Sequence, residues 1–205
     1  MKRISIAITV LILLASSSLY AIPFGFTSIT NNSATNAATG QAQLVVDVTD
    51  AGNDQVLFTF LNNGPLASSI CDVYFDNGPL LSIAGIINTP DTVDFSLGAS
   101  PSNLPGGNTV GFVSSFSADS NTPTALKGVN PGESLGILFN LMGEKTFSDV
   151  MASLNSGDLM IGINVQAFGD EGSESFVNTP VPEPATLLLL GIGLLGLAGF
   201  RKRAG

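Results

Sequence analysis

Residues 55–61 read Gln-Val-Leu-Phe-Thr-Phe-Leu, and this stretch decides the fold class of the 205-residue chain. Val56, Phe58 and Phe60 recur at every second position, which is the period of a β-strand with one apolar face. Turn-forming residues rich in Asp, Asn, Gly and Pro stand on both sides of the run. A strand of this kind needs a second layer of sheet to cover its apolar face.

Further short runs along the chain have a similar strand-like pattern and are separated by turn residues rather than by helices. This arrangement disfavours a parallel α/β fold, in which strands and helices alternate. We therefore expect an all-β protein, an antiparallel β-sandwich of about eight strands, with a jelly roll or a small barrel as the alternative. The other strands are expected at residues 42–49, 69–75, 80–87, 93–97, 110–116, 133–141 and 159–168.

One segment has helical periodicity instead. Thr146 can cap the start of a helix, and Asp149 stands three positions later, as in a capping box. Apolar residues then follow at helical spacing as far as Leu154, and Gly157 can end the helix. We expect a single short helix that covers one edge or end of the sheets.

Residues 1–21 have the three-part organisation of a secretory signal peptide. Lys2 and Arg3 precede an apolar core at residues 4–14, and small residues then lead to Ala21. Cleavage after Ala21 is the expected processing step, and it implies that the protein is exported.

Residues 179–205 form a second addressing segment at the other end of the chain. Proline fixes its own backbone and restricts the residue before it, so Pro182, Glu183 and Pro184 are expected to form an extended stem. The uncharged apolar run at residues 185–200 is predicted to be a single transmembrane helix. A basic stop follows it, where positive residues hold the end of a membrane segment in the cytoplasm: Arg201, Lys202 and Arg203.

The sequence Val-Pro-Glu-Pro-Ala-Thr, the Leu/Gly repeats and the final Arg-Lys-Arg occur in the order and spacing of one family's tail. This segment resembles the PEP-CTERM sorting domain of Gram-negative bacteria. In that family an exosortase, a membrane transpeptidase-like protease, recognises the tail and cuts it near Pro-Glu-Pro during export. The resemblance implies an exosortase as processing partner, a temporary membrane attachment, and a cell-surface or extracellular location. An ordinary tail anchor with a proline-rich stem is the alternative.

The region between the addressing segments is long enough for one domain. Residues 22–41 are polar and poor in apolar anchors, so we expect a flexible lead-in to a β-sandwich domain at residues 42–178. The region holds 15 acidic residues and only Lys127 and Lys145 as bases, a formal charge of −13. A field of that sign disfavours nucleic acid as a partner.

The chain offers few residues for catalysis. It has no histidine, which removes the usual base of a serine or cysteine hydrolase and the commonest transition-metal ligand. A glycosidase needs two carboxylates about 5–10 Å apart, and the candidate pairs are Asp72 with Asp76 and Asp91 with Asp94. Without tryptophan, and with Tyr74 as the one tyrosine left after signal removal, the chain lacks the usual aromatic platforms for sugar rings.

Asp47, Asp50, Asn53 and Asp54 cluster around one predicted turn. Hard oxygen ligands from loops are what calcium binds, so this cluster is a candidate calcium site. Asp and Asn are also the ordinary residues of turns, and the spacing is not that of an EF-hand, so we expect no cofactor and keep calcium as the alternative. Cys71, the one cysteine, lies in a predicted strand and is expected to be buried rather than paired with another chain.

These observations favour an exported, non-enzymatic surface or matrix protein with a structural or adhesive role. Contact with exopolysaccharide is implied by the family resemblance alone. The alternatives are a carbohydrate-active enzyme that uses an Asp pair and a calcium- or glycan-binding module. Two carboxylates across a cleft would favour the enzyme, whereas a loop with convergent oxygens would favour the binding module.

Overall fold

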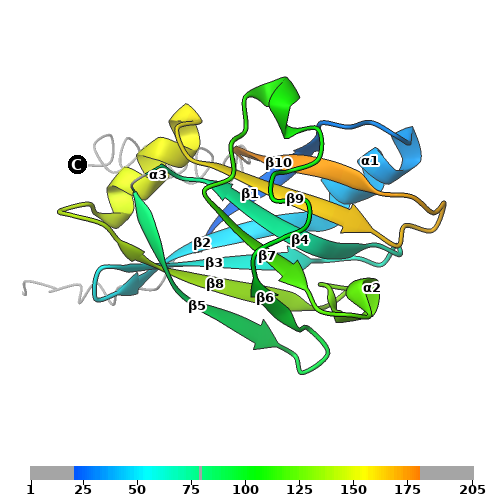
Figure 1. Cartoon of the computed structure of the whole chain (residues 1–205), viewed down its shortest axis with the longest axis horizontal. Helices are drawn as coiled ribbons and strands as arrows, with labels where there is room; N and C mark the ends of the chain where they lie inside the picture. Colours follow the sequence, from blue (N-terminus) through cyan, green and yellow to red (C-terminus); the bar gives the residue numbers. More distant parts are fainter. Residues whose placement is uncertain (1–20, 79, 181–205) are drawn as a thin grey trace, which may run out of the picture.

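The computed structural model describes residues 21–78 and 80–180, and ten strands of this part form one antiparallel sheet (Figure 1). The helices are α1 (Ala34–Gln43), α2 (Thr124–Lys127) and α3 (Phe147–Ser156), with a short 3-10 helix η1 at Gly107–Val110. The strands are β1 (Ile22–Ser28), β2 (Leu44–Gly52), β3 (Gln55–Asn62), β4 (Ser69–Asp76), β5 (Leu81–Thr89), β6 (Phe95–Leu97), β7 (Phe116–Ser120), β8 (Ser134–Leu141), β9 (Met160–Gln166) and β10 (Glu174–Pro180).

Several predicted segments lie outside the described residues. They are the signal peptide as far as residue 20, the transmembrane helix at residues 185–200 and the basic residues after it. Within residues 21–78 and 80–180, no helix combines the length and the apolar character needed to cross a membrane.

The sheet runs in the order β5-β8-β3-β2-β1-β10-β9-β4-β7-β6 and curls until its two edge strands approach each other. The side chain of Asn88 on β5 bridges this gap. It accepts a hydrogen bond from the Phe95 N–H at 2.9 Å and donates one to the Phe95 carbonyl at 3.3 Å. The all-β prediction is confirmed, but a nearly closed single sheet replaces the two separate sheets of the expected sandwich and lies closer to the barrel alternative.

The sheet is continuous because β1 pairs with two neighbours. Residues 22–24 pair with β2, and residues 24–28 pair with β10. Phe24 and Phe26 are buried in the core below this strand. The prediction of a flexible lead-in at residues 22–41 is therefore wrong, since β1 and α1 occupy that region. Two apolar anchors are too few to produce a strand pattern, but pairing on both sides supplies the stability that the pattern did not indicate.

The polar helix α1 forms because its ends and its packing suit small and polar residues. Ser33 caps its start and accepts a hydrogen bond from the Asn36 N–H at 3.3 Å. Gly40 lets the helix approach β10 closely, because a Cβ at this position would lie 2.2 Å from the Phe176 ring. Packing through a glycine leaves no apolar periodicity in the sequence, which explains why the helix was not predicted.

The predicted strand at residues 55–61 agrees with β3 almost residue for residue. Val56, Phe58 and Phe60 are completely buried, whereas the residues between them are partly exposed on the outer face. Phe58 packs edge-to-face against Phe75 of β4, with ring centroids 5.0 Å apart, and Phe75 in turn packs against Phe139 of β8 at 4.8 Å. The core therefore joins strands from both ends of the sheet order.

Helix α3 confirms the prediction from local sequence. Thr146 and Asp149 form the reciprocal capping box, and Gly157 ends the helix with a φ of 84°. Val150 and Leu154 are buried, so the helix closes one end of the curled sheet. The strand expected at residues 110–116 is wrong, because β7 begins only at Phe116 and the preceding residues belong to a long covering segment.

The outer face of the sheet has two different halves. In the covered half, made of β10, β9, β4 and β7, Leu104 and Phe112 of the segment at residues 98–115 pack on Tyr74. In the open half, made of β2, β3, β8 and β5, Leu57 and Leu138 are partly exposed and Ile87 is 45% exposed. Of the helices, α1 lies against β1 and β10, and α2 lies against β4 and β7.

Candidate functional site

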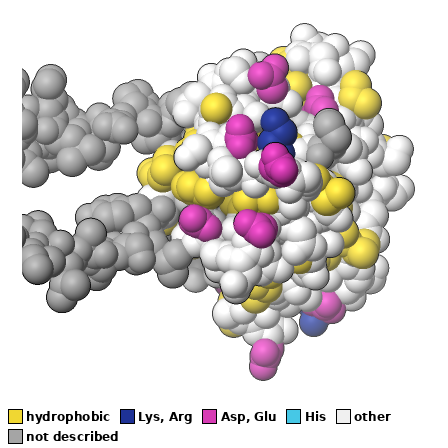
Figure 2. All heavy atoms as spheres, turned by 90° about the vertical axis from the view of Figure 1, so that its left-hand side faces the viewer, with side chains coloured by type: hydrophobic (Ala, Val, Ile, Leu, Met, Phe, Trp, Pro, Cys, Tyr) yellow, Lys and Arg dark blue, Asp and Glu magenta, His cyan; other side chains and the backbone are white. Residues whose placement is uncertain are grey.

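The described chain begins and ends at the same end of the sheet. Phe24 near the start of β1 lies opposite Pro180, the last residue of β10. Helix α3 lies at this end, and the chain both enters and leaves there (Figure 1). We call it the tether end, and define it by the start of β1, the end of β10, α3, and the described residues of the turns at 51–54, 77–78 and 142–146, with Leu80. Figure 2 views the molecule from this side.

The predicted sorting residues lie just beyond the described chain. Pro182, Glu183 and Pro184 are not among the described residues, nor are the three basic residues: Arg201, Lys202 and Arg203. Val181 alone separates Pro180 from Pro182. The stem of the tail therefore follows directly on a strand that is hydrogen-bonded within the sheet.

Strand β10 is held at its other end by Glu174. This buried carboxylate accepts hydrogen bonds from the Ser28 and Thr30 hydroxyls and from the Ser33 N–H. Burial alone would raise the pKa of Glu174, but these hydrogen bonds outweigh burial and hold the pKa below its usual value. The carboxylate thus fixes the turn that leads from β1 into α1 and ties it to the last strand.

The four candidate calcium ligands lie in β2 or in the turn between β2 and β3. Asp47 is partly buried in β2, and three positions later Asp50 turns to the other face of the strand, where its Oδ1 accepts a hydrogen bond from the Gly52 N–H at 2.9 Å. Asn53 and Asp54 have φ values of 51° and 56°, as a tight turn requires. Among the described residues, no three Asp, Glu, Cys or His side chains are arranged to hold a metal ion. Calcium at this turn stays a prediction.

The structure instead brings together a pair of carboxylates from two strands. Asp72 of β4 lies directly opposite Asp119 of β7, so the two carboxyl groups are neighbours across the strand pair. Asp72 is only 4% exposed. Burial, together with the charge of Asp119, raises the pKa of Asp72 to about 7. Asp72 therefore keeps its proton up to the neutral range, because its charged form would be buried beside a second carboxyl group.

Neither Asp pair proposed from sequence spacing has this arrangement. The Asp76 carboxylate accepts a hydrogen bond from the Val113 N–H at 3.0 Å. Asp94 accepts a hydrogen bond from the Asn121 side chain at 2.9 Å and lies 3.8 Å from the Lys127 ammonium. Spacing along the chain could not identify the Asp119 partner, because the register of β4 against β7 brings it to Asp72 across 46 intervening residues.

A row of polar side chains continues from the Asp72–Asp119 pair across the covered half. Asn164 of β9 lies opposite Asp72, and its amide donates a hydrogen bond to the Ser175 hydroxyl at 3.1 Å. Tyr74, two positions along β4, donates a hydrogen bond to the Pro101 carbonyl at 3.0 Å. Among the described residues, no lysine or arginine forms an ion pair with Asp72 or Asp119, so a proton on Asp72 is the available way to relieve the repulsion between them.

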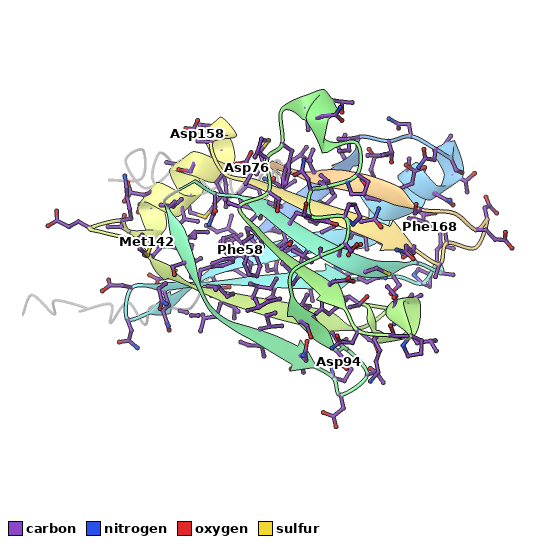
Figure 3. The ribbon with its side chains drawn as sticks, viewed as in Figure 1. Phe58, Asp76, Asp94, Met142, Asp158 and Phe168 are labelled. Atoms are coloured by element: carbon purple, nitrogen blue, oxygen red, sulfur yellow. The ribbon has the colours of Figure 1, made fainter. Side chains whose placement is uncertain are left out.

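The surface hollows lie away from this pair. A hollow of about 430 Å3 lies at the tether end, where Leu80, Met142, Lys145 and Asp158 contribute to its lining. Figure 3 places Met142 and Asp158 on this side of the molecule. Another hollow of about 290 Å3 lies beside the gap between β5 and β7, and Ile83 and Phe116 line it. Neither hollow includes Asp72 or Asp119 in its lining.

Cys71 is completely buried beside Asp72, as the sequence predicted. Burial raises the pKa of its thiol to about 11, so the thiolate is scarce at neutral pH. This cysteine is therefore a packing residue rather than a nucleophile.

Comparison with known families identifies the tail. A family model described as the PEP-CTERM protein-sorting motif matches residues 180–203. The chain therefore carries a PEP-CTERM sorting motif. It therefore belongs to the class of exosortase substrates, which are exported and reach the surface or the exterior after processing. The match begins at the last residue of β10, so it covers the tail and none of the sheet before Pro180. No curated protein and no solved structure matched the chain.

Proposed function

We propose that the β-domain of this PEP-CTERM protein is structural or adhesive cargo without enzymatic activity, displayed at the cell surface after its tail is removed. One observation supports this most directly: the sorting motif starts at the final residue of the sheet. A cut near Pro182–Pro184 would leave the ten-stranded sheet complete. Before that cut, while the tail is in the membrane, the end of the sheet opposite the tether end would face away from the membrane.

The charge of the domain suits such a location. With 15 acidic residues and two lysines between residues 22 and 180, it would be strongly hydrated and would resist collapse onto other polyanions. A role within exopolysaccharide fits this charge only if contacts are made through hydroxyl and amide groups. Serine, threonine and asparagine, which can make such contacts, are abundant between the strands.

A carbohydrate-active enzyme is the second candidate, and the raised pKa of Asp72 is the observation that favours it. Two features weigh against it. Glycosidase carboxylates stand about 5–10 Å apart with the sugar between them, whereas Asp72 and Asp119 lie side by side on adjacent paired strands, so no sugar can enter between them. The pair also lines neither of the two larger hollows. We therefore assign the raised pKa of Asp72 to its buried place in the sheet rather than to catalysis.

The sorting part of the proposal is tested by the mass of the mature protein from its native host, with and without the exosortase. We expect a product that begins at Ile22 and ends near Pro182–Pro184 when the exosortase is present, and a product with the full tail when it is absent. A mature protein that still ends in Arg201-Lys202-Arg203 in the presence of the exosortase would overturn this part.

The non-enzymatic part is tested in a strain that lacks the gene. Re-expression of the wild-type chain and of Asp72→Asn should restore cell cohesion or matrix retention equally, because the carboxylate pair is structural. Restoration by the wild type alone, with equal surface levels of both proteins, would favour the enzyme instead.

A further inference from the structure

The tether end is unusually close to the segment that the protease must cut. A fully extended chain spans at most about 3.6 Å per residue, so Pro182 lies at most about 7 Å and Pro184 at most about 14 Å from Pro180. The last residues of β10, Asn178, Thr179 and Pro180, are paired with β1, so the domain cannot swing away without breaking the sheet. A protease with its cleft on this stem must therefore meet the tether end.

The surface at this point has the composition of a protein-docking site. Met142 is 45% exposed and lines the hollow of about 430 Å3, and Leu80 contributes to the same lining. Lys145 is on the rim of this hollow. Figure 2 shows an apolar band at this end with acidic side chains along both of its borders. An apolar centre with a polar rim is the usual anatomy of an interface between proteins.

The acidic border argues for a protein rather than a lipid partner. Most of the charged residues of the tether-end turns and of α3 are acidic, and Lys145 is the one cation among those described there. Acidic side chains are repelled by anionic headgroups, so a membrane surface would not hold this end by charge. The apolar hollow would still accept a side chain from a membrane-bound protein.

We propose that the tether end, centred on Met142 and its hollow, is a docking surface for the exosortase itself. The enzyme then reads the folded domain together with the Pro-Glu-Pro stem. This inference rests on the proposed sorting function and adds to it a surface on the cargo that no tail motif contains.

The test uses the full chain in host cells, with the rate of tail removal followed by pulse-chase. Met142→Glu places a charge at the centre of the surface and should slow removal about five-fold or more. The matched control is Leu126→Glu, because Leu126 is 71% exposed on α2 at the opposite end and should leave the rate within about two-fold. Equal rates for both variants and the wild type would overturn the proposal.

A second arm separates docking from a defect in folding or export. Ten Gly/Ser residues inserted between Pro180 and Val181 allow the protease to reach the stem without meeting the domain. With this linker, Met142→Glu should be processed at the rate of the wild-type domain. If the variant is still slow with the linker, docking is not the cause and the proposal fails.

A photo-crosslinking residue at position 142 of the full chain identifies the partner. We expect an adduct with the exosortase, and adducts with lipid alone would overturn the proposal. If the tail of the wild-type chain is removed equally well with and without the exosortase, the sorting function is overturned instead. The two failures are therefore distinguishable.

Discussion

The two halves of the sheet differ in which part of the chain packs over their outer face. Each half has a glycine in an inner strand, and a large side chain occupies the space that the missing Cβ leaves. A Cβ at Gly162 in the covered half would lie 2.6 Å from Leu104, and one at Gly136 in the open half would lie 3.1 Å from Ile87. Leu104 comes from the covering segment, whereas Ile87 belongs to the neighbouring strand β5.

This difference decides what each half can bury. The covering segment shields part of one outer face from water, and β4 is buried on both sides, so its outer face can hold the buried carboxyl group of Asp72. The open half keeps water on its outer face, and β3 alternates buried and partly exposed residues along its whole length. A covered sheet loses the alternation that makes an antiparallel strand recognisable.

The largest difference between the halves is expected in their response to pH. The pKa of Asp72 rises from about 4 in the unfolded chain to about 7 in the fold, so the folded state holds its proton more tightly. The stabilisation from that proton is complete below about pH 4 and is lost as the pH rises through about 7, on the order of 2–4 kcal/mol in all. Asp72→Asn should remove most of this dependence in urea denaturation between pH 4 and pH 8.

Asp47→Asn is the matched control in the open half. Burial also raises the pKa of Asp47, but this side chain is only partly buried on the outer face. Its substitution should change the pH dependence much less than Asp72→Asn does. Equal slopes for the two variants would show that the covered half does not hold a special carboxylate pair.

The next largest effect on stability is expected when the two side chains that pack over these glycines are shortened. Leu104 is 2% exposed, so Leu104→Ala should lower the free energy of unfolding by about 3 kcal/mol. Ile87 is 45% exposed, so Ile87→Ala should cost about 1 kcal/mol. Chemical denaturation measures both, and a cost at Ile87 equal to that at Leu104 would contradict the division into covered and open halves.

Replacing each of the two glycines with alanine should lower the free energy of unfolding by less than shortening the side chain that packs over it. Gly162→Ala forces Leu104 and its segment to move, because its Cβ would be well inside contact distance, and we expect a loss of about 2 kcal/mol. Gly136→Ala would bring its Cβ to 3.1 Å from the Ile87 Cβ, so this exposed neighbour must shift by a few tenths of an ångström, and the cost should be under about 1 kcal/mol. Thermal unfolding of the two variants provides the comparison, and a reversed order would mean that the covering segment adapts more easily than the sheet.

The smallest effect is expected where the two halves meet. Asn88→Ala removes both hydrogen bonds between the edge strands, and these bonds are solvent-accessible, so the cost should be about 0.5–1 kcal/mol. Hydrogen exchange should accelerate at Phe95 and leave β3 unchanged. Faster exchange throughout the core would show that the gap controls global rather than local opening.

The segments that could be predicted are those whose signal is local. The alternation around Phe58 and the capping residues around Thr146 were sufficient for β3 and α3. Strand β1 and helix α1 were missed because their stability comes from neighbours, as the contact of Gly40 with Phe176 illustrates. The strand expected at residues 110–116 was misplaced because apolar residues such as Phe112 serve the covering segment rather than a ladder.

By itself, the sequence determined the all-β class and the sorting tail, because strand alternation and a linear recognition motif are properties of short stretches of chain. Only the tertiary structure decided that the sheet closes into one layer, that Asp72 meets Asp119, and that the tail leaves beside the start of β1. Each of these depends on which strands pair and in what register. Register is set by the summed packing of distant residues, which no single stretch of sequence contains.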